Sequence, residues 1–310
     1  MAMIDRVSKV GKIKFYMEHT VPFLGVSKDV LEADLVIMGV PYDYTSTFRP
    51  GSRFAPNSIR EASMNIEAYS STKRRSCERL DVSDIGNLII SNNIDETLNL
   101  IGKVVSYLKE LEKVVVTIGG EHTITKGCIS QLMGEDGGLL CFDAHLDLRD
   151  EFHCTRLNHA TFMRRVMEEM RPERAMFIGV RASSQEELDY ASKVGIKIIS
   201  AKKFSSLNLA SLEEIVQRTM GNRPLYISID FDVVDPSFAP AVGNPEPNGI
   251  NPLKLIDLLA GISMGNEVVG ADLVEVSPKY DEGGTAILAA KVVMELISTI
   301  RASRSSSTSL

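Results

Sequence analysis

The sequence is poor in the features that mark secreted and membrane proteins. Its 310 residues include only four cysteines, and no two of them form a Cys-x-x-Cys pair, so a disulfide scaffold is not expected. No stretch approaches the roughly 18 consecutive apolar residues that cross a bilayer. Residues 1–25 lack the apolar core and the small-residue cleavage site of a secretory signal. These absences predict a protein of the reducing cytoplasm with no membrane partner.

A surplus of basic charge is also missing. Subtracting 41 acidic from 34 basic residues leaves a net charge of −7, whereas proteins that bind the nucleic-acid backbone carry a basic surplus. Nucleic acid is therefore not an expected partner. Apolar residues make up 44% of the chain and charged residues 24%, which is ordinary globular usage and excludes general disorder.

The chain has no repeating signature with a period of about 20 to 50 residues, so solenoids and propellers are excluded. Its length fits one or two domains by the usual size of about 150 residues, and α/β folds often hold this length in one. We expect a single domain over 1–310, with an amino-terminal extension over 1–33. The Ser-rich end, 302–310, is expected to be a frayed tail or a subunit contact.

Short β-rich runs alternate with amphipathic helical segments along the chain. Strands are predicted at 34–40, 114–120, 139–145, 175–180, 196–200, 225–232 and 267–276, and helices at 100–113, 161–170, 211–220 and 252–262. Near-continuous apolar strands joined by helices predict a three-layer αβα fold with a mostly parallel central sheet. Ligands of such sheets bind beyond the carboxyl ends of the strands.

Four of the five histidines fall within residues 122–159. His122 follows a predicted strand, near the start of a helix at about Thr123. The next strand ends in Asp143, His145 and Asp147, whose spacing of two residues would point all three side chains the same way. In an extended strand the outer two lie about 13 Å apart, too far to share one ion held at about 2 Å. The chain must curl there or serve two ions.

A later strand ends in Asp230 and Asp232, which completes a set of six candidate metal ligands. Two imidazoles and four carboxylates are a hard, oxygen-rich set that suits Mn²⁺ better than structural zinc. Four carboxylates carry about −4 and two divalent ions about +4, whereas one ion would leave buried anions repelling one another. The pattern therefore predicts two metal ions.

Each of these residues also has a purely structural interpretation. A single Asp-x-His pair after a strand is more often a turn or a helix cap than a ligand, but three strand ends offering such residues together favour a metal site. His19 is expected at the surface, and His153 either at the pocket mouth or in a solvated loop.

Seven motifs follow one another between about residues 34 and 300. They are GVPYD at 39–43, RPGSRFAPNSIREAS at 49–63, GGEHTIT at 119–125, FDAHLDL at 142–148, NHATFMRR at 158–165, SIDFDVVDPSFAPAVGNPEPNG at 228–249 and DLVEVSPKYD at 272–281. This set resembles the manganese ureohydrolases, the family of arginases, agmatinases and their relatives, and most closely the agmatinases. Ala160, Phe231 and the loop AVGNPEPNG depart from the commonest family spelling, which bears on the shape of the pocket more than on the chemistry.

The resemblance implies an arginase-like fold, two Mn²⁺ ions per subunit and a homo-oligomer, either a trimer or a hexamer. It implies that Asp143 and Asp230 bridge the ions, with His122 and Asp147 completing one site and His145 and Asp232 the other. It also implies that His159 is the acid–base shuttle and that Glu275 binds the guanidinium group of the substrate. On the sequence alone, His159 could instead cap a helix and Glu275 could belong to a core salt bridge.

We expect hydrolysis of agmatine to putrescine and urea, through attack by a hydroxide that the two ions generate from water, with Asp147 accepting a hydrogen bond or proton and His159 assisting departure of the amine. Between Asp147 and His159 the chain lacks the set of Asn, Ser and Thr donors with which arginases hold the α-carboxylate of arginine, so agmatine is favoured. Asp150 and Glu151 could attract the amine of agmatine, whereas Arg149 would oppose it.

Other functions stay open at this point. Close alternatives are arginase and the hydrolases of guanidinobutyrate or formiminoglutamate. A two-metal phosphoesterase would want basic or Gly-rich anion donors, which the motif loops hardly supply. A related deacetylase would need one ion and a paired-histidine base, and a non-catalytic, metal-stabilised assembly subunit would turn over no guanidine.

Overall fold

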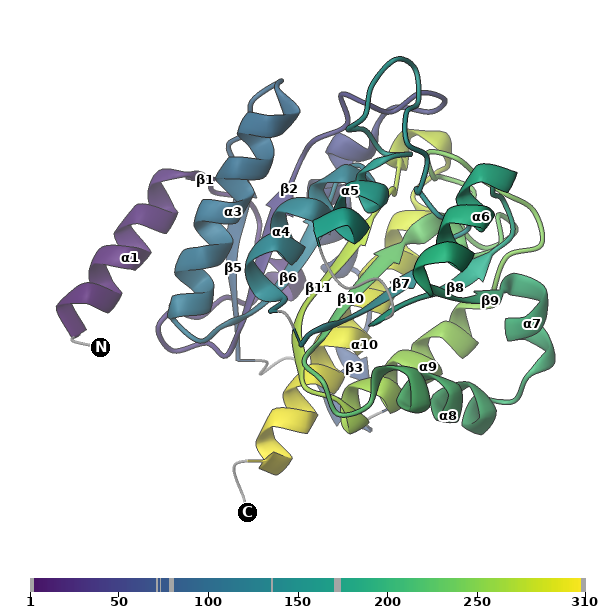
Figure 1. Ribbon diagram of the computed structural model, residues 1–310. Helices are drawn as coiled ribbons and strands as arrows, with labels where there is room; N and C mark the ends of the chain where they lie inside the picture. The colour runs from purple at the N-terminus through teal and green to yellow at the C-terminus, as the bar shows by residue number, and fades with distance from the viewer. Residues whose placement is uncertain are drawn as a thin grey trace.

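A nine-stranded sheet forms the centre of the molecule (Figure 1). The structure, a computed structural model, describes residues 3–70, 72, 74–77, 81–134, 136–169 and 174–307. The strand order across the sheet is β1 (Met17–Glu18), β5 (Val82–Leu88), β2 (Leu35–Val40), β6 (Val114–Gly119), β11 (Val268–Val274), β10 (Leu225–Asp230), β7 (Gly138–Phe142), β8 (Ala175–Val180) and β9 (Lys197–Ser200). The β1–β5 pair is antiparallel and the other pairs are parallel, which confirms the predicted mostly parallel sheet.

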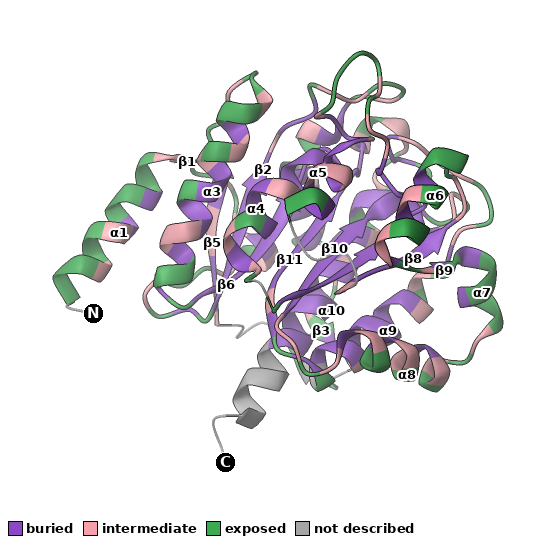
Figure 2. Ribbon diagram, viewed as in Figure 1, coloured by how far each residue is buried: buried purple, intermediate pink, exposed green. Residues whose placement is uncertain are grey.

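Helices cover both faces of the sheet. One face packs against α1 (Met3–Phe15), α3 (Ile94–Glu110), α4 (Thr125–Leu132), α5 (Phe162–Glu169) and α6 (Gln185–Val194). The other packs against α2 (Ala55–Ser63), α7 (Ala201–Ser206), α8 (Leu209–Met220), α9 (Pro252–Gly265) and α10 (Gly284–Ser307). Val36 and Ile37 of β2 are both buried but belong to opposite cores, because successive strand residues point to opposite faces. In Figure 2 the central strands are accordingly buried along their length.

The helices begin where the sequence supplies capping side chains. Asn93 accepts a hydrogen bond from the amide of Glu96 at the start of α3, and Asn251 caps α9, whose first residue is Pro252. Ser184 and Glu187 form a reciprocal capping box at the start of α6. These local signals set where each helix begins, and burial of an apolar face then stabilises it.

Several predicted boundaries differ from the observed ones. The predicted strands at 139–145, 225–232 and 267–276 end earlier, at Phe142, Asp230 and Val274, so most of the candidate ligands lie in the loops that follow. A 3-10 turn over His122–Ile124 precedes α4, which begins at Thr125. α10 continues to Ser307, so the first part of the expected tail is helical, and residues 308–310 lie outside the described residues.

The amino-terminal segment joins the main fold. α1 packs against α3, and β1 forms the antiparallel edge of the sheet beside β5. A separate two-stranded hairpin pairs β3 (Tyr69–Ser70) with β4 (Arg75–Ser76). Among the described helices, none combines the length and the apolar composition that a membrane crossing requires.

Strand β5 escaped prediction because its sequence, VSDIGNL, interrupts the apolar run with an acid and two other polar residues. The structure explains the acid. Asp84 accepts two hydrogen bonds, at 2.8 and 2.9 Å, from the guanidinium of Arg60 in α2, and both side chains are almost fully buried. Arg60 also donates to the side chain of Asn87 at 2.7 Å and thereby ties α2 to this edge of the sheet.

Arg60→Met is expected to lower the free energy of unfolding by about 3–5 kcal/mol, because it leaves Asp84 buried without its partner. Urea denaturation of both proteins measures the loss. Arg218→Met is the matched control, since Arg218 is exposed on α8 and pairs with Glu214 at the surface, where such pairs contribute about 1 kcal/mol or less. Equal losses in the two variants would contradict the structural role of the buried pair.

Candidate active site

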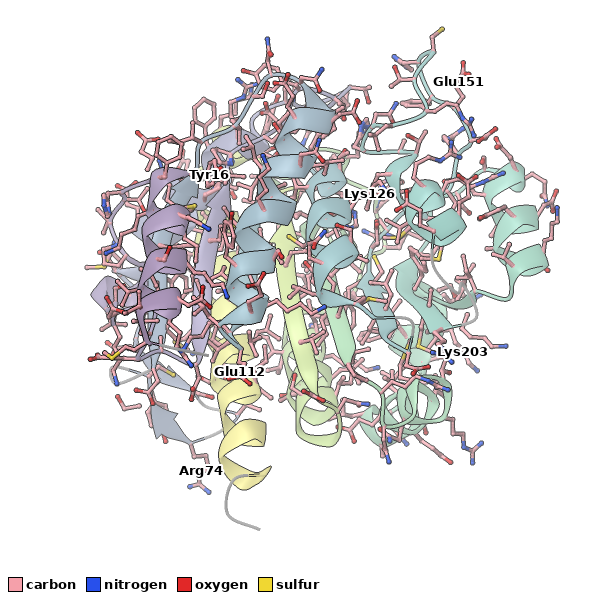
Figure 3. All side chains as sticks on the ribbon, turned by 60° about the vertical axis from the view of Figure 1, so that its left-hand side comes forward. Tyr16, Arg74, Glu112, Lys126, Glu151 and Lys203 are labelled. Atoms are coloured by element: carbon pink, nitrogen blue, oxygen red, sulfur yellow. The ribbon has the colours of Figure 1, made fainter. Side chains whose placement is uncertain are left out.

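The predicted site residues gather at one end of the central sheet. Strands β6, β11, β10 and β7 are parallel neighbours, so their carboxyl ends meet at the same edge. His122 follows β6, Asp143 follows β7 and Glu275 follows β11. In Figure 1 the loops after β2 and β7 rise above this edge. Figure 3 places Glu151, in the loop after β7, at the opposite end of the molecule from Glu112, which precedes β6.

The imidazole of His122 faces three carboxylates. Its Nδ1 lies 3.3 Å from Oδ2 of Asp143, 3.2 Å from Oδ2 of Asp147 and 3.3 Å from Oδ2 of Asp230. Nδ1 of His122 and Oδ2 of Asp143 are both buried, and neither has a hydrogen-bond partner. Unpartnered buried polar atoms are rare in folded proteins. These two atoms, together with Oδ2 of Asp147 and Oδ2 of Asp230, form a group of ligand atoms suited to a cation.

A second imidazole faces the same cluster from the other side. Nδ1 of His145 lies 2.9 Å from Oδ2 of Asp232 and 3.6 Å from Oδ1 of Asp143. Its Nε2 lies 3.9 Å from Oε1 of Glu246. Asp143 therefore presents one oxygen to each imidazole, which is the arrangement a carboxylate shared by two cations requires. Ligand atoms of Asp143, His145 and Asp232 all lie within 4.8 Å of one another.

The chain curls after β7 to bring these groups together. The backbone amide of His145 donates to Oδ1 of Asp143 at 2.6 Å, which closes a tight turn directly after the strand. Asp147 has a φ of 54°, a left-handed conformation that residues other than glycine rarely adopt. Of the two alternatives left open by the spacing, the chain therefore takes the curled path, and the pairwise approach of Asp143 and Asp147 to His122 follows from it.

The other ring nitrogen of His122 is held by a buried relay. Its Nε2 lies 2.9 Å from Oγ of Ser228, and Ser228 donates its proton to Oδ1 of Asp272 at 2.6 Å. Tyr226 donates to Oδ2 of Asp272 at 2.7 Å. Because the proton of Ser228 is committed to Asp272, Nε2 of His122 must donate, so Nδ1 is the nitrogen left to face the carboxylates and to bind a cation. This is the orientation of a metal-binding imidazole.

This relay was not predicted from the sequence. Ser228 lies two residues before Asp230 and so shares its strand face, and Asp272 is an acid within the apolar strand β11. The signal available in the sequence was a polar residue, Ser228, on the same strand face as the predicted ligand Asp230.

The carboxylates of the cluster are too crowded to ionise together without added positive charge. Burial, followed by the negative charge of Asp143, raises the pKa of Asp147 to about 7. Burial, followed by the charges of Asp232 and Asp143, raises the pKa of Asp230 well above its usual range. Cys141 also brings its sulfur close to His122 and Asp143, and burial raises the pKa of its thiol. Divalent cations fit this donor set and charge.

His159 lies at the edge of the cluster in a fixed orientation. Its Nδ1 is 3.0 Å from the carbonyl oxygen of Thr45, which can only accept, so Nδ1 carries the proton and Nε2 holds the lone pair. Nε2 lies 3.3 Å from the hydroxyl of Thr47. Burial, followed by the positive charges of His145 and His122, lowers the pKa of His159 to about 4. At neutral pH the ring is therefore uncharged, and Nε2 is the nitrogen that can accept a proton.

Glu275 stands at the carboxyl end of β11 with its carboxylate buried. Its Oε1 accepts a hydrogen bond from the amide of His122 at 2.8 Å, and a φ of 65° turns the residue into this position. Burial, followed by the charge of Glu121, raises the pKa of Glu275 well above its usual range. A Cβ at Gly243 would come within 2.6 Å of Oε2, so the glycine leaves this oxygen room. A cation beside it would favour the ionised form.

Asp150, a predicted substrate-binding residue, does not join this cluster. Its carboxylate accepts hydrogen bonds from Arg165 at 2.6 Å and from Arg156 at 2.9 Å. These two arginines lower the pKa of Asp150 to about 2. Because its charge is already matched by two guanidinium groups, the structure does not support a role for Asp150 in holding an amine.

The remaining candidates lie outside the cluster. His19 and His153 are exposed, and the ring of His153 packs 4.4 Å from that of Phe152. The guanidinium carbon of Arg149 lies 5.3 Å from the centre of the Phe152 ring, and Nε of Arg149 lies 3.9 Å from Oε2 of Glu187.

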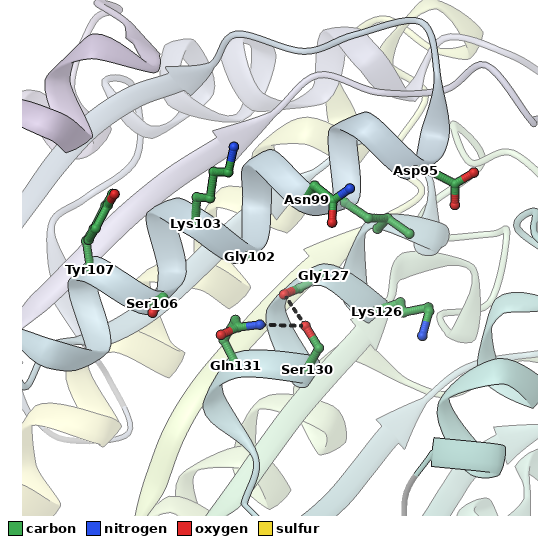
Figure 4. A pocket seen from close by; sticks show the side chains of 11 residues that line it. Asp95, Asn99, Gly102, Lys103, Ser106, Tyr107, Lys126, Gly127, Ser130 and Gln131 are labelled. Carbon is green, nitrogen blue, oxygen red and sulfur yellow. Dashed lines mark hydrogen bonds between the residues drawn. The ribbon is translucent and has the colours of Figure 1, made fainter.

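A separate groove of about 690 Å³ lies between α3 and α4 (Figure 4). Its walls carry Lys103, Tyr107, Lys126 and Gln131 among other residues, and Ser130 bonds to the carbonyl of Gly127 within it. It does not include any of the nine predicted site residues, so the candidate site rests on the cluster at the sheet edge.

A parallel sheet covered on both faces, with imidazoles and carboxylates converging at its carboxyl edge, defines an α/β enzyme with a candidate metal centre. The chain belongs to the arginase family, whose model matches residues 33–298. It is 36% identical over 271 residues to an agmatinase of Bacillus cereus, covering 86% of this chain and 91% of that one. A guanidinobutyrase of Pseudomonas aeruginosa is 33% identical, with 85% of each chain covered.

Solved structures give the same family. An agmatine ureohydrolase of Thermoplasma volcanium superposes with a TM-score of 0.86 at 32% identity, over 93% of this chain and 97% of that one. Family membership and these relatives identify the protein as a hydrolase and confirm the predicted arginase-like fold.

Proposed function

We propose that this protein is a manganese-dependent agmatinase that hydrolyses agmatine to putrescine and urea. The observation that carries the proposal is the cluster itself: Nδ1 of His122 and Nδ1 of His145 face opposite oxygens of Asp143, beside the buried carboxylate of Glu275. Agmatinase relatives at 36% identity over most of the chain support the same reaction.

Two Mn²⁺ ions fit the six predicted ligands. Asp143 and Asp230 would be shared, with His122 and Asp147 on one side and His145 and Asp232 on the other. The orphaned Nδ1 of His122 and Oδ2 of Asp143 are the atoms that such an ion would satisfy. When bound, two divalent ions lower the pKa of water from 15.7 to near 7 and so supply a nucleophile at neutral pH.

The protein's own groups bind the substrate and move its protons. Glu275 would accept hydrogen bonds from the guanidinium with Oε2, since Oε1 is held by the amide of His122. His159, neutral and with its lone pair on Nε2, would take a proton and return it to the leaving amine. Asp147 would accept a hydrogen bond from the attacking water.

The tail of the substrate is the point on which the family members differ. Agmatine ends in an ammonium group, whereas guanidinobutyrate and formiminoglutamate end in carboxylates. Glu246 places a negative charge near the cluster, 3.9 Å from His145, with 39% of its side chain exposed. A carboxylate at this place attracts an ammonium tail and repels a carboxylate tail. It favours agmatine over guanidinobutyrate, the substrate named for a relative that is 33% identical.

The proposal is tested by a substrate panel. Metal-loaded protein and protein treated with a chelator are incubated with agmatine, arginine, guanidinobutyrate, formiminoglutamate and a phosphate ester, and release of urea, formamide and phosphate is measured. We expect the metal-loaded protein to release urea from agmatine and the chelator-treated protein to release none. Preference for another guanidino compound would overturn the choice of substrate, and urea formation that survives complete metal removal would overturn the reaction. The proposal also includes a cytoplasmic homo-oligomer, a trimer or hexamer, which analytical ultracentrifugation would test.

A further inference from the structure

Glu121 is a buried acid that neither the metal cluster nor the substrate explains. Its side chain is fully buried although it directly precedes His122. Its Oε2 accepts a hydrogen bond from the backbone amide of Thr45 at 2.8 Å. Its Oε1 accepts one from the hydroxyl of Thr123 at 2.6 Å and another, short one from the hydroxyl of Thr45. A carboxylate is costly to bury unless it is hydrogen-bonded, and two of these three bonds hold a single residue, Thr45.

Thr45 in turn holds His159 at two points. Its hydroxyl oxygen accepts a hydrogen bond from the backbone amide of His159 at 3.0 Å, and its carbonyl oxygen accepts the Nδ1 proton at 3.0 Å. The first bond fixes the backbone of His159, and the second fixes the plane and the tautomer of its ring. Since the proton of the Thr45 hydroxyl goes to Glu121, its lone pair is left to accept from His159.

The loop that carries Thr45 has a separate structural anchor. Asp43 accepts hydrogen bonds from the amides of Gly51, at 2.8 Å, and Arg53, at 3.3 Å, and pairs with the guanidinium of Arg53. These contacts close the loop between β2 and α2 without Glu121. The bonds from Glu121 to Thr45 therefore act at the residue of the loop that accepts the Nδ1 proton of the imidazole.

We propose that Glu121 and Thr45 are a positioning pair that holds His159 in the tautomer and orientation in which its Nε2 exchanges protons with the substrate. The inference deepens the proposed function and rests on it, because it assumes that His159 acts as the acid–base group. Neither residue of the pair touches the substrate. Hydrogen-bond partners that orient a functional histidine typically change activity by about 10- to 100-fold when they are removed.

The first test compares hydroxyl-bearing and hydroxyl-free side chains at residue 45 of the full-length, metal-loaded protein. Thr45→Val removes the hydroxyl and keeps the shape, so kcat for agmatine should fall by about 10- to 100-fold while KM and metal content stay within about two-fold. Thr45→Ser keeps the hydroxyl and should restore kcat to within about three-fold. Glu121→Gln keeps the volume but donates where the carboxylate accepted, so it should lower kcat in the same way. Ser46→Ala, on the adjacent residue, is the control.

The second test asks whether the pair acts through His159. His159→Ala should lower kcat by about 10²- to 10⁴-fold, and adding Thr45→Val to it should lower kcat by less than about two-fold more. Glu121→Gln combined with His159→Ala gives a second, independent form of this test if Thr45→Val folds poorly.

The outcomes separate the inference from the proposed function. Three results would overturn the positioning pair. The first is an equal loss of kcat from Thr45→Val whether or not His159 is present. The others are a wild-type kcat in both Thr45→Val and Glu121→Gln, or a defect that is explained by loss of bound metal. Wild-type kcat in His159→Ala would instead overturn the acid–base role on which the inference rests.

Discussion

Asp143→Asn is expected to abolish urea formation by the metal-loaded protein. Asp143 is the carboxylate that faces both imidazoles, with Oδ2 3.3 Å from Nδ1 of His122 and Oδ1 3.6 Å from Nδ1 of His145. An amide at this position offers one neutral oxygen in place of two charged ones, so one cation site loses a ligand and the other keeps only an uncharged one. Without the cations, water keeps a pKa of 15.7 rather than about 7, and hydroxide at neutral pH falls by more than eight orders of magnitude.

Metal analysis of the purified protein and a urea assay measure this result together. The wild-type protein should retain two divalent ions per chain, and Asp143→Asn fewer than one. Asp189→Asn makes the same chemical change on the exposed face of α6 and should leave both quantities unchanged. Two bound ions and normal turnover in Asp143→Asn would show that Asp143 is not a shared ligand.

The central sheet was predictable because its strands are apolar on both faces. Runs such as VVVTIG in β6 and LYISID in β10 are buried at every residue, and only a parallel sheet between two helical layers produces that pattern. The edge strand β5 breaks it, because Asp84 enters the core together with Arg60 from α2. Pairing of two buried charges across 24 residues leaves no periodic signal in either segment.

The convergence of the candidate ligands was predictable for a related reason. His122, Asp143 and Asp230 end or follow neighbouring parallel strands, and parallel strands place their carboxyl ends at one edge. Hydrogen-bond partners were not predictable, because they depend on how loops meet. Thr45 lies 114 residues from His159 in the sequence, yet it makes two hydrogen bonds to it.

The same limit applies to Asp150, whose pairing with two arginines the sequence did not predict. An acid in a loop beside the site attracts a cation only when its charge is free, and Arg165 reaches Asp150 from α5, 15 residues later in the chain. The sequence shows both charges but not their distance. Glu246, in the loop after β10, lies 3.9 Å from Nε2 of His145.

Glu275→Gln is expected to lower kcat/KM for agmatine by about 10- to 100-fold while the bound metal stays at the wild-type level. The amide of His122 donates to Oε1 of Glu275, so the carbonyl oxygen of the new glutamine would turn toward His122. Its NH₂ group would then face the substrate's guanidinium, which is also a donor, and the charged hydrogen bond would be lost. Hydrogen bonds to charged groups contribute about 1.5–3 kcal/mol, which corresponds to this change in rate.

Steady-state kinetics with agmatine, together with metal analysis, distinguish this variant from loss of the metal centre. Glu214→Gln removes an exposed carboxylate of α8 and should leave the kinetics unchanged. A wild-type kcat/KM in Glu275→Gln would show that the guanidinium is held elsewhere. A loss accompanied by missing metal would show that Glu275 acts by fixing the backbone of His122. Unchanged metal with a lowered kcat/KM is therefore the combination that assigns the carboxylate to the substrate.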